Sequence, residues 1–228
     1  MPRKPTFYFV DLFSGTGSFG AAARVWAANH GMRFELLSLD IHPKYNPTHC
    51  VDLMKWDYQR ALREFLPRKP REDDIIWVHA SPPCNAYSFA NNYYADKDFG
   101  SSDKLVRRVF RIIDSVRPDF WTVENPRGFL RTRPFMKPMQ KYEHLTSYCH
   151  FGSQFRKDTN IWTNVDVSLP VCRAGSECRY KAENGLHQAV AQTRDKIPGP
   201  QYRLIQSVEE LYALPRRLCT HLLNAALD

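Results

Sequence analysis

The sequence predicts an α/β fold in which a mostly parallel sheet carries helices on both faces, and three observations support this prediction. Strand-like and helix-like segments alternate along the chain, which is the order that a parallel sheet with crossover helices requires. The apolar strand-like segments end in polar residues of the kind found at functional sites. The 228 residues are 43% hydrophobic and 25% charged, which suits one domain with a buried core and excludes a disordered tail, a collagen-like repeat or a coiled coil.

Four short apolar segments predict the strands. The first, residues 6–13, is rich in aromatic and β-branched side chains, as expected of a buried strand. The other three are residues 34–39, 74–80 and 120–123. Because ligands in such folds bind at the carboxyl ends of the strands, the polar residues there should gather at one rim. They are residues 11–14, Asp40, residues 81–84 and residues 124–126.

Helices are expected between and after the strands. Apolar positions at helical spacing predict one over residues 103–116, with Arg107, Arg108 and Arg111 on its other side. The remaining helices are expected at residues 21–29, 55–65, 207–214 and 215–227. We therefore divide the chain into a catalytic core (residues 1–163), a short irregular insert (residues 164–206) and a helical segment that returns to the core (residues 207–228).

The charge balance suggests an anionic partner. Lys and Arg total 32 against 24 Asp and Glu, a net charge of +8, which favours nucleic acid over the alternative of a simply solvated basic surface. No apolar run approaches the roughly 20 residues of a membrane span, and no signal peptide is evident. We therefore expect no membrane association and a location in the cytoplasm or nucleus. The 6 cysteines should then be reduced, catalytic or metal-bound.

A glycine-rich turn predicts a nucleotide cofactor. Gly15-Thr-Gly17-Ser-Phe-Gly20 matches G-x-G-x-x-G between a strand and a helix, and Asp40 follows at the end of the next strand, where its carboxylate can accept hydrogen bonds from ribose hydroxyls. The motif does not separate NAD, FAD and S-adenosylmethionine, and a plain turn is the alternative. Asp52 is a candidate for the adenine amino group or an ordinary surface acid.

Two further strand-end motifs carry reactive groups. In Ser81-Pro82-Pro83-Cys84 the prolines fix the backbone, so the thiol is held in one direction. The alternative is a buried cysteine with a purely structural role. In Glu124-Asn125-Pro126 a partly desolvated carboxyl group can hold or deliver a proton, or it can simply pair with Arg127 or Arg131. A nucleophile, an acid and a nucleotide cofactor together suggest group transfer onto an electron-poor ring.

These motifs resemble, in order and spacing, those of the cytosine-5 DNA methyltransferases. The segment from Asp11 to Gly17 resembles the cofactor motif, the Pro-Pro-Cys segment the nucleophile motif, and Glu124-Asn125-Pro126 the E-N-V motif. Residues 152–157 resemble the Q-x-R-x-R motif, with Asp158 in place of the last Arg. The resemblance covers residues 6–163 and, more weakly, residues 212–223.

The resemblance implies a Rossmann-like, S-adenosylmethionine-dependent methyltransferase of the short form found in viruses and phages. It implies that Cys84 attacks carbon-6 of cytosine, that Glu124 contacts ring N3 and that Arg156 holds O2. The implied cofactor-binding residues are Asp11, Phe13, Ser14, Gly15, Gly17, Asp40, Ile41, Asp52 and Pro82. The implied substrate is double-stranded DNA with the target cytosine flipped out of the helix, over which the loop after Cys84, including residues 91–94, would close.

The chain also departs from the family pattern. The insert is short, which suits a short target sequence, and no Gly-Asn pair precedes Pro215. An RNA cytosine-5 methyltransferase, a nicotinamide- or flavin-dependent oxidoreductase and an inactive nucleic-acid-binding module stay open as alternatives. Candidate phosphate contacts are Ser88, Arg127, Arg131, Arg133 and Lys137.

The insert holds a weak metal signal. Cys149, Cys172, Cys178 and His187 are the residue types of a Cys₃His zinc site, although their spacing is not that of a zinc knuckle. A zinc ion would order an insert that lacks a core of its own. Unligated thiols are the alternative.

Overall fold

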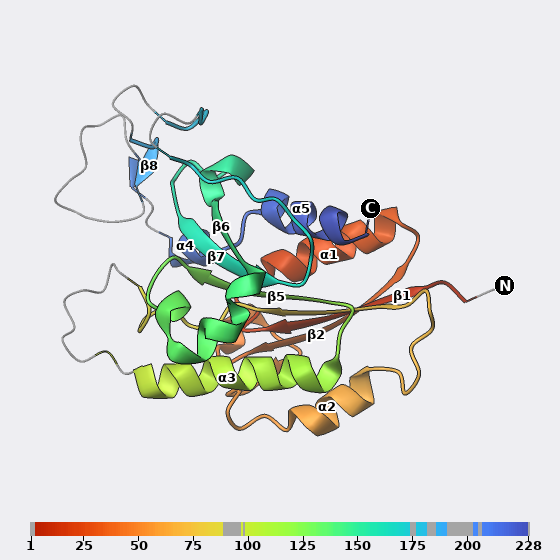
Figure 1. The fold of residues 1–228 in the computed structure, drawn as a ribbon. Coiled ribbons are helices and arrows are strands. Elements are labelled where there is room, and N and C mark those ends of the chain that lie inside the picture. Colours follow the sequence, from red (N-terminus) through yellow and green to blue (C-terminus); the bar gives the residue numbers. More distant parts are fainter. Residues whose placement is uncertain are drawn as a thin grey trace.

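A seven-stranded sheet forms the centre of the computed structural model, which describes residues 3–88, 97, 99–173, 177–181, 186–190, 203–204 and 207–227 (Figure 1). The strands are β1 (Thr6–Leu12), β2 (Arg33–Asp40), β3 (His49–Cys50), β4 (Ile75–Ala80), β5 (Phe120–Pro126), β6 (Glu143–Ser147) and β7 (Asp158–Thr163). Their spatial order is β3-β2-β1-β4-β5-β7-β6. Strands β1 to β5 are parallel, whereas β7 is antiparallel to both β5 and β6. The predicted mostly parallel sheet is confirmed.

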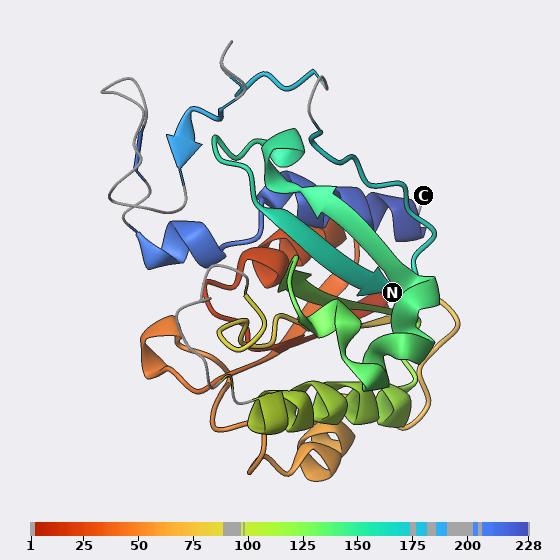
Figure 2. The ribbon, with the colours of Figure 1, turned by 60° about the vertical axis from the view of Figure 1, so that its left-hand side comes forward.

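Helices cover both faces of the sheet, as predicted. Figures 1 and 2 show α1 (Ser18–Asn29) and α5 (Arg216–Leu227) on one face and α2 (Tyr58–Phe65) and α3 (Phe99–Val116) on the other. Strand β1 serves both layers because successive side chains of a strand point to opposite faces. Its Phe7 and Phe9 join the α1–α5 core, while Val10 and Leu12 join the core under α3.

The segment after the insert returns to the core. Helix α5 packs against α1, and the indole nitrogen of Trp26 donates a hydrogen bond of 3.1 Å to the side-chain oxygen of Asn224. The described part of residues 164–206 contains only β8 (Ala189–Val190) and β9 (Arg203–Leu204), which pair with each other, and α4 (Val208–Tyr212) follows it. The three-part division of the chain stays a prediction.

Several elements differ from the sequence expectations. Helix α2 begins at Tyr58 rather than at residue 55, because the Asp57 carboxylate caps it by accepting a 3.1 Å hydrogen bond from the Arg60 amide. Strands β6 and β7 were not predicted, nor were the short 3₁₀ helices, which include η1 (Pro43–Tyr45), η3 (Leu130–Thr132), η4 (Pro134–Tyr142) and η5 (Tyr148–Phe151). Across the described ranges, each helix is too short or too polar to span a bilayer.

Candidate active site

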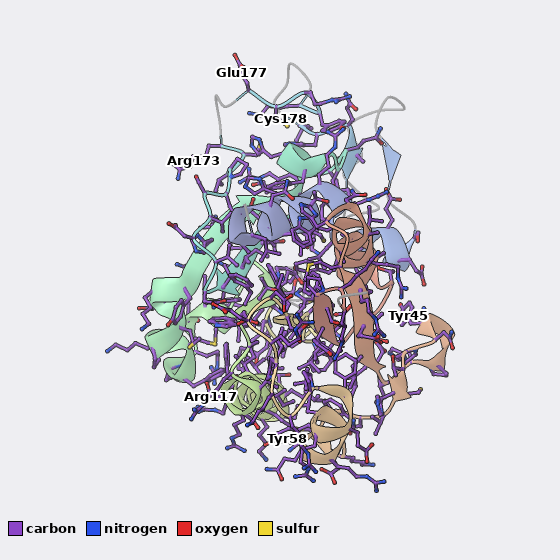
Figure 3. All side chains as sticks on the ribbon, turned by 90° about the vertical axis from the view of Figure 1, so that its right-hand side faces the viewer. Tyr45, Tyr58, Arg117, Arg173, Glu177 and Cys178 are labelled. Atoms are coloured by element: carbon purple, nitrogen blue, oxygen red, sulfur yellow. The ribbon has the colours of Figure 1, made fainter. Side chains whose placement is uncertain are left out.

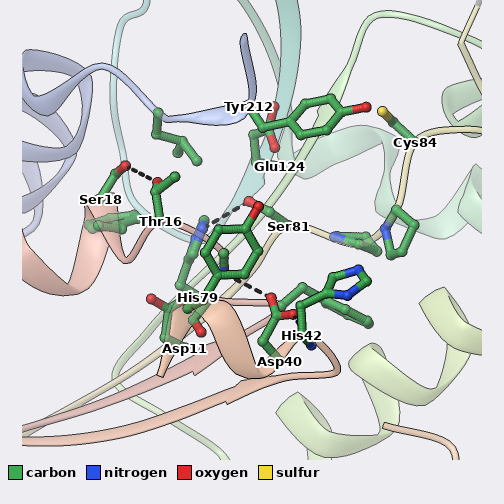
Figure 4. A pocket seen from close by; sticks show the side chains of 18 of the residues that line it. Asp11, Thr16, Ser18, Asp40, His42, His79, Ser81, Cys84, Glu124 and Tyr212 are labelled. Carbon is green, nitrogen blue, oxygen red and sulfur yellow. Dashed lines mark hydrogen bonds between the residues drawn. The ribbon is translucent and has the colours of Figure 1, made fainter. Parts of the chain in front are cut away.

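A cavity of about 450 Å³ opens at the carboxyl ends of the central strands (Figure 4). Asp11 of β1, Asp40 of β2, Ser81 after β4 and Glu124 of β5 all line it, so segments far apart in the sequence meet at one rim. This is the convergence that the parallel topology predicts.

The glycine turn forms one wall of the cavity. Phe13, Gly15 and Gly17 have φ values of 60°, 46° and 68°, in the left-handed region that only glycine adopts freely. The turn is tied to β2, because the Gly15 amide donates to a carboxylate oxygen of Asp40 at 2.9 Å. The other Asp40 oxygen accepts from the His42 amide at 2.8 Å. Each oxygen therefore keeps a lone pair for a ligand.

Asp11 is a buried acid whose pKa lies well above the ordinary value. Burial, together with the charge of Asp40, raises the pKa of Asp11 to about 7, although a hydrogen bond from the Gly20 amide lowers it. Gly20 packs against this carboxyl group, since a β-carbon there would lie 3.5 Å from an Asp11 oxygen. Asp11 thus connects the end of β1 to the first turn of α1 at the wall of the cavity.

The Cys84 loop is held in place by the end of β5 and by the residues that follow it. The side-chain amide of Asn125 donates to the Pro82 carbonyl at 2.9 Å, and the Phe129 amide donates to the Tyr87 carbonyl at 2.8 Å. Gly128 allows this approach, because a β-carbon at that position would overlap the Tyr87 carbonyl. The two motifs that the sequence singled out are therefore one bonded unit.

The thiol and the carboxyl group face the same cavity. Burial and the nearby Glu124 charge raise the pKa of Cys84, and the charge of Lys157 lowers it. Glu124 is buried, and one of its carboxylate oxygens accepts a 3.0 Å hydrogen bond from the Tyr148 hydroxyl. Because burial raises the pKa of Tyr148 well above its ordinary value, this hydroxyl stays protonated and acts as the donor.

Arg156, the arginine of the predicted motif, is not among the residues lining the cavity. Its guanidinium donates to the two carboxylate oxygens of Asp158 at 2.9 and 2.6 Å. Partial burial raises the pKa of Asp158, but the hydrogen bonds from Arg156 and Ser147 outweigh it and lower the pKa. The next residue, Lys157, lines the cavity instead. A role for Arg156 at the substrate stays a prediction.

Most of the predicted cofactor-binding residues line the cavity, and two do not. Those lining the cavity are Asp11, Phe13, Ser14, Gly15, Asp40, Ile41 and Pro82. Gly17 and Asp52 are not among them, and the Asp52 carboxylate accepts a 2.9 Å hydrogen bond from the Met54 amide. The predicted lid, residues 91–94, lies outside the described residues.

Three of the predicted phosphate contacts are paired with acids. The Asp158, Glu143 and Asp103 carboxylates lie 3.9, 2.9 and 2.9 Å from Arg127, Arg131 and Arg133, respectively. Glu124 is therefore not the partner of Arg127 or Arg131 in these ion pairs. Lys137 is exposed on η4, and the Ser88 carbonyl accepts a hydrogen bond from Lys97. The phosphate roles stay predictions.

The sequence did not reveal several lining residues. His79 hydrogen-bonds to Thr122 at 2.8 Å and to Ser81 at 3.1 Å, and burial lowers its pKa to about 3, so the ring is neutral. Tyr212, from the segment after the insert, extends toward Cys84 (Figure 4). The usable signal for His79 was its place near the end of a strand, and that for Tyr212 was its place in the weaker stretch of family resemblance, residues 212–223.

These features define a class of protein. It is a Rossmann-like α/β fold in which a nucleotide-type turn, two acids, a cysteine and a buried glutamate share one cavity at the strand ends.

Comparison with known proteins then gives the family. The chain is 30% identical over 181 residues to a probable DNA (cytosine-5)-methyltransferase of Frog virus 3 (isolate Goorha), an alignment that covers 74% of this chain and 75% of that protein. It is 26% identical over 188 residues to the type II methyltransferase M.FnuDI of Fusobacterium nucleatum, covering 71% of this chain and 50% of that protein. No family model matches the chain. The chain belongs to the DNA cytosine-5-methyltransferase family and is an enzyme of this type.

Proposed function

We propose that this enzyme transfers a methyl group from S-adenosylmethionine to carbon-5 of cytosine in double-stranded DNA, through a covalent bond between Cys84 and the base. The observation that carries the proposal is that Cys84, Glu124 and the glycine turn line one cavity. The name of the Frog virus 3 relative supports DNA and cytosine carbon-5 as the substrate and the site of reaction, and that of the Fusobacterium nucleatum relative supports methyl transfer.

The wall formed by the turn suits a nucleoside cofactor. A cavity of about 450 Å³ falls within the usual range of roughly 300–1,000 Å³ for small-molecule sites. Asp40 retains lone pairs for ribose hydroxyls, and Phe13 and Ile41 offer apolar surface beside it. When bound, S-adenosylmethionine supplies an electrophilic methyl group. The residues that would hold it are the lining members of the predicted set.

Cys84 solves the chemical problem of the reaction, which is that carbon-5 of cytosine is a poor nucleophile. Its thiolate forms a bond to carbon-6, and the ring electrons move toward carbon-5, which then accepts the methyl group. Loss of the carbon-5 proton to water and cleavage of the sulfur–carbon bond restore the ring and the thiolate. Lys157 supports this role because its charge lowers the pKa of the thiol against the effect of burial.

Glu124 balances the charge that develops on the ring. In its protonated form it donates to ring N3, and its second oxygen accepts from the exocyclic amine. Tyr148 fixes the carboxyl group in position from the protein side. A base stacked in a duplex cannot enter this cavity, so the target cytosine must be flipped out, at an unstacking cost of about a few kcal/mol. The short insert suits a short target sequence.

The test uses DNA in which 5-fluorocytosine replaces cytosine. Fluorine at carbon-5 cannot leave as a cation, so the enzyme should stay covalently bound to this DNA on a denaturing gel. With ordinary DNA, label from methyl-labelled S-adenosylmethionine should enter carbon-5 of cytosine. Cys84→Ala should abolish both signals and still bind the cofactor.

Cys50→Ser is the matched control, because Cys50 is an exposed free cysteine that does not line the cavity. It should behave like the unaltered enzyme. Full methyl transfer by Cys84→Ala would refute the covalent step. Label that enters RNA of the same sequence, and not DNA, would refute the substrate and favour the RNA methyltransferase.

A further inference from the structure

Four potential metal ligands converge away from the active-site cavity. Cys149, Cys172, Cys178 and His187 each offer one ligand atom, and these atoms all lie within 4.8 Å of one another. Cys149 belongs to η5 of the core, whereas the other three come from the insert. Figure 3 shows Cys178 at the end of the molecule opposite Tyr58 of α2. None of the four lines the active-site cavity.

The distances match a tetrahedral zinc centre. With Zn–S bonds of about 2.3 Å and a Zn–N bond of about 2.0–2.1 Å, the nitrogen–sulfur edge of a tetrahedron is about 3.5 Å. His187 Nε2 lies 3.5 Å from the sulfur of Cys172 and 3.5 Å from that of Cys178. One nitrogen therefore faces two sulfurs at the spacing that a shared metal ion imposes.

The surroundings are those of a structural site. Cys149, Cys172 and His187 are 3%, 1% and 8% exposed, so their ligand atoms are largely withdrawn from water. Three sulfurs and an imidazole are the donors that zinc prefers, and four protein ligands leave no open coordination position for catalysis. We propose that Cys149, Cys172, Cys178 and His187 bind one Zn²⁺ ion that fastens the insert to the catalytic core.

A metal ion has a clear structural use at this place. The regular structure in the described part of the insert is limited to the two-residue strands β8 and β9, which cannot by themselves hold the segment on the core. A four-ligand zinc ion would close three successive loops and join all of them to η5. Metal binding commonly supplies the ordering energy of such small segments.

The site is also hydrogen-bonded to the end of β6 and, through it, to the start of β7. The Cys172 amide donates to the Ser147 hydroxyl at 3.0 Å, and that hydroxyl donates to the Asp158 carboxylate at 2.6 Å. Asp158 in turn holds Arg156. The metal would therefore brace the residues that precede and begin β7.

The experiment measures metal in the full-length protein purified without chelators. We expect about one zinc ion per chain by elemental analysis, as four protein ligands imply. Replacement by Co²⁺ should give the intense visible absorption of tetrahedral cobalt and a sulfur-to-cobalt charge-transfer band. Cys178→Ser should lose the metal, whereas Cys50→Ser should keep it.

A ligand-preserving variant separates metal binding from simple packing. His187→Cys should retain zinc with four sulfur ligands, and His187→Ala should lose it. Less than about one tenth of a zinc ion per unaltered chain would overturn the proposal and leave a hydrogen-bonded thiol cluster. None of these readouts uses methyl transfer, so they stand apart from the test of the proposed function.

Discussion

Replacing Asp11 with Asn should remove a large pH dependence from the stability of this enzyme. The pKa of Asp11 is about 7 in the folded protein because of burial and the charge of Asp40, against an ordinary value of 3.8. Between pH 5 and pH 7 the folded protein holds this proton and the unfolded chain does not. Well below pH 7 each pH unit therefore lowers the free energy of unfolding by about 1.4 kcal/mol, and because Asp11 is half-ionised at pH 7 the loss from pH 5 to pH 7 is about 2 kcal/mol.

The sign follows from the raised pKa. The contribution of Asp11 is fully present below the unfolded pKa and is lost as the pH rises through the folded value. Asn keeps a side-chain oxygen for the Gly20 amide but has no proton to release. A loss of about 2 kcal/mol is a large share of the roughly 5–15 kcal/mol that stabilises a typical domain.

Urea unfolding of both proteins at pH 5, 6, 7 and 8 measures this effect. The free energy of unfolding of the unaltered enzyme should fall relative to that of Asp11→Asn up to pH 7 and change little beyond it. Parallel curves for the two proteins would refute the reasoning. Asp40→Asn is the second variant, and it should reduce the slope without abolishing it, because burial is the larger cause.

Two further predictions concern the reacting groups. Tyr148→Phe removes the 3.0 Å hydrogen bond to Glu124, and a hydrogen bond of this kind contributes about 0.5–1.5 kcal/mol, so kcat/KM should fall roughly 2- to 10-fold; an unchanged kcat/KM would contradict the positioning of Glu124 by this hydroxyl. In a Cys50→Ser background, Lys157→Met should move the pH midpoint of Cys84 alkylation to higher pH, because the lysine charge lowers the pKa of the thiol. Arg156→Met should leave that midpoint in place. Mass spectrometry of the alkylated protein at each pH gives both midpoints, and equal shifts for the two substitutions would show that Lys157 has no special effect on the thiol.

The central sheet could be predicted because its signals are local. Strands β1, β2, β4 and β5 are apolar runs bounded by polar residues, and their parallel order fixes which of their ends meet. The convergence of Asp40, Cys84 and Glu124 at one rim follows from that order alone. It needs no knowledge of any long-range contact beyond the sheet itself.

The antiparallel edge could not be predicted in the same way. Strand β6, Glu143–Ser147, contains both polar and apolar side chains, and β7 is recognisable only from the partner on which it packs. The pairing of Tyr148 with Glu124 depends on this edge, and so does the contact of Cys149 with the insert. Cysteine and histidine content alone suggested the metal cluster, and only the fold brings its members together.

The different positions of Arg156 and Lys157 fit the geometry of an extended chain. Successive side chains in such a chain point to opposite sides, so residues 156 and 158 share one side and residue 157 faces the other. The acid at position 158, which stands where the family motif has an arginine, binds Arg156 on that shared side. Residue type therefore favoured Arg156 as the cation of the site, whereas the period of two places Lys157 in the cavity. The Asp158 carboxylate therefore holds the Arg156 guanidinium away from the residues that line the cavity.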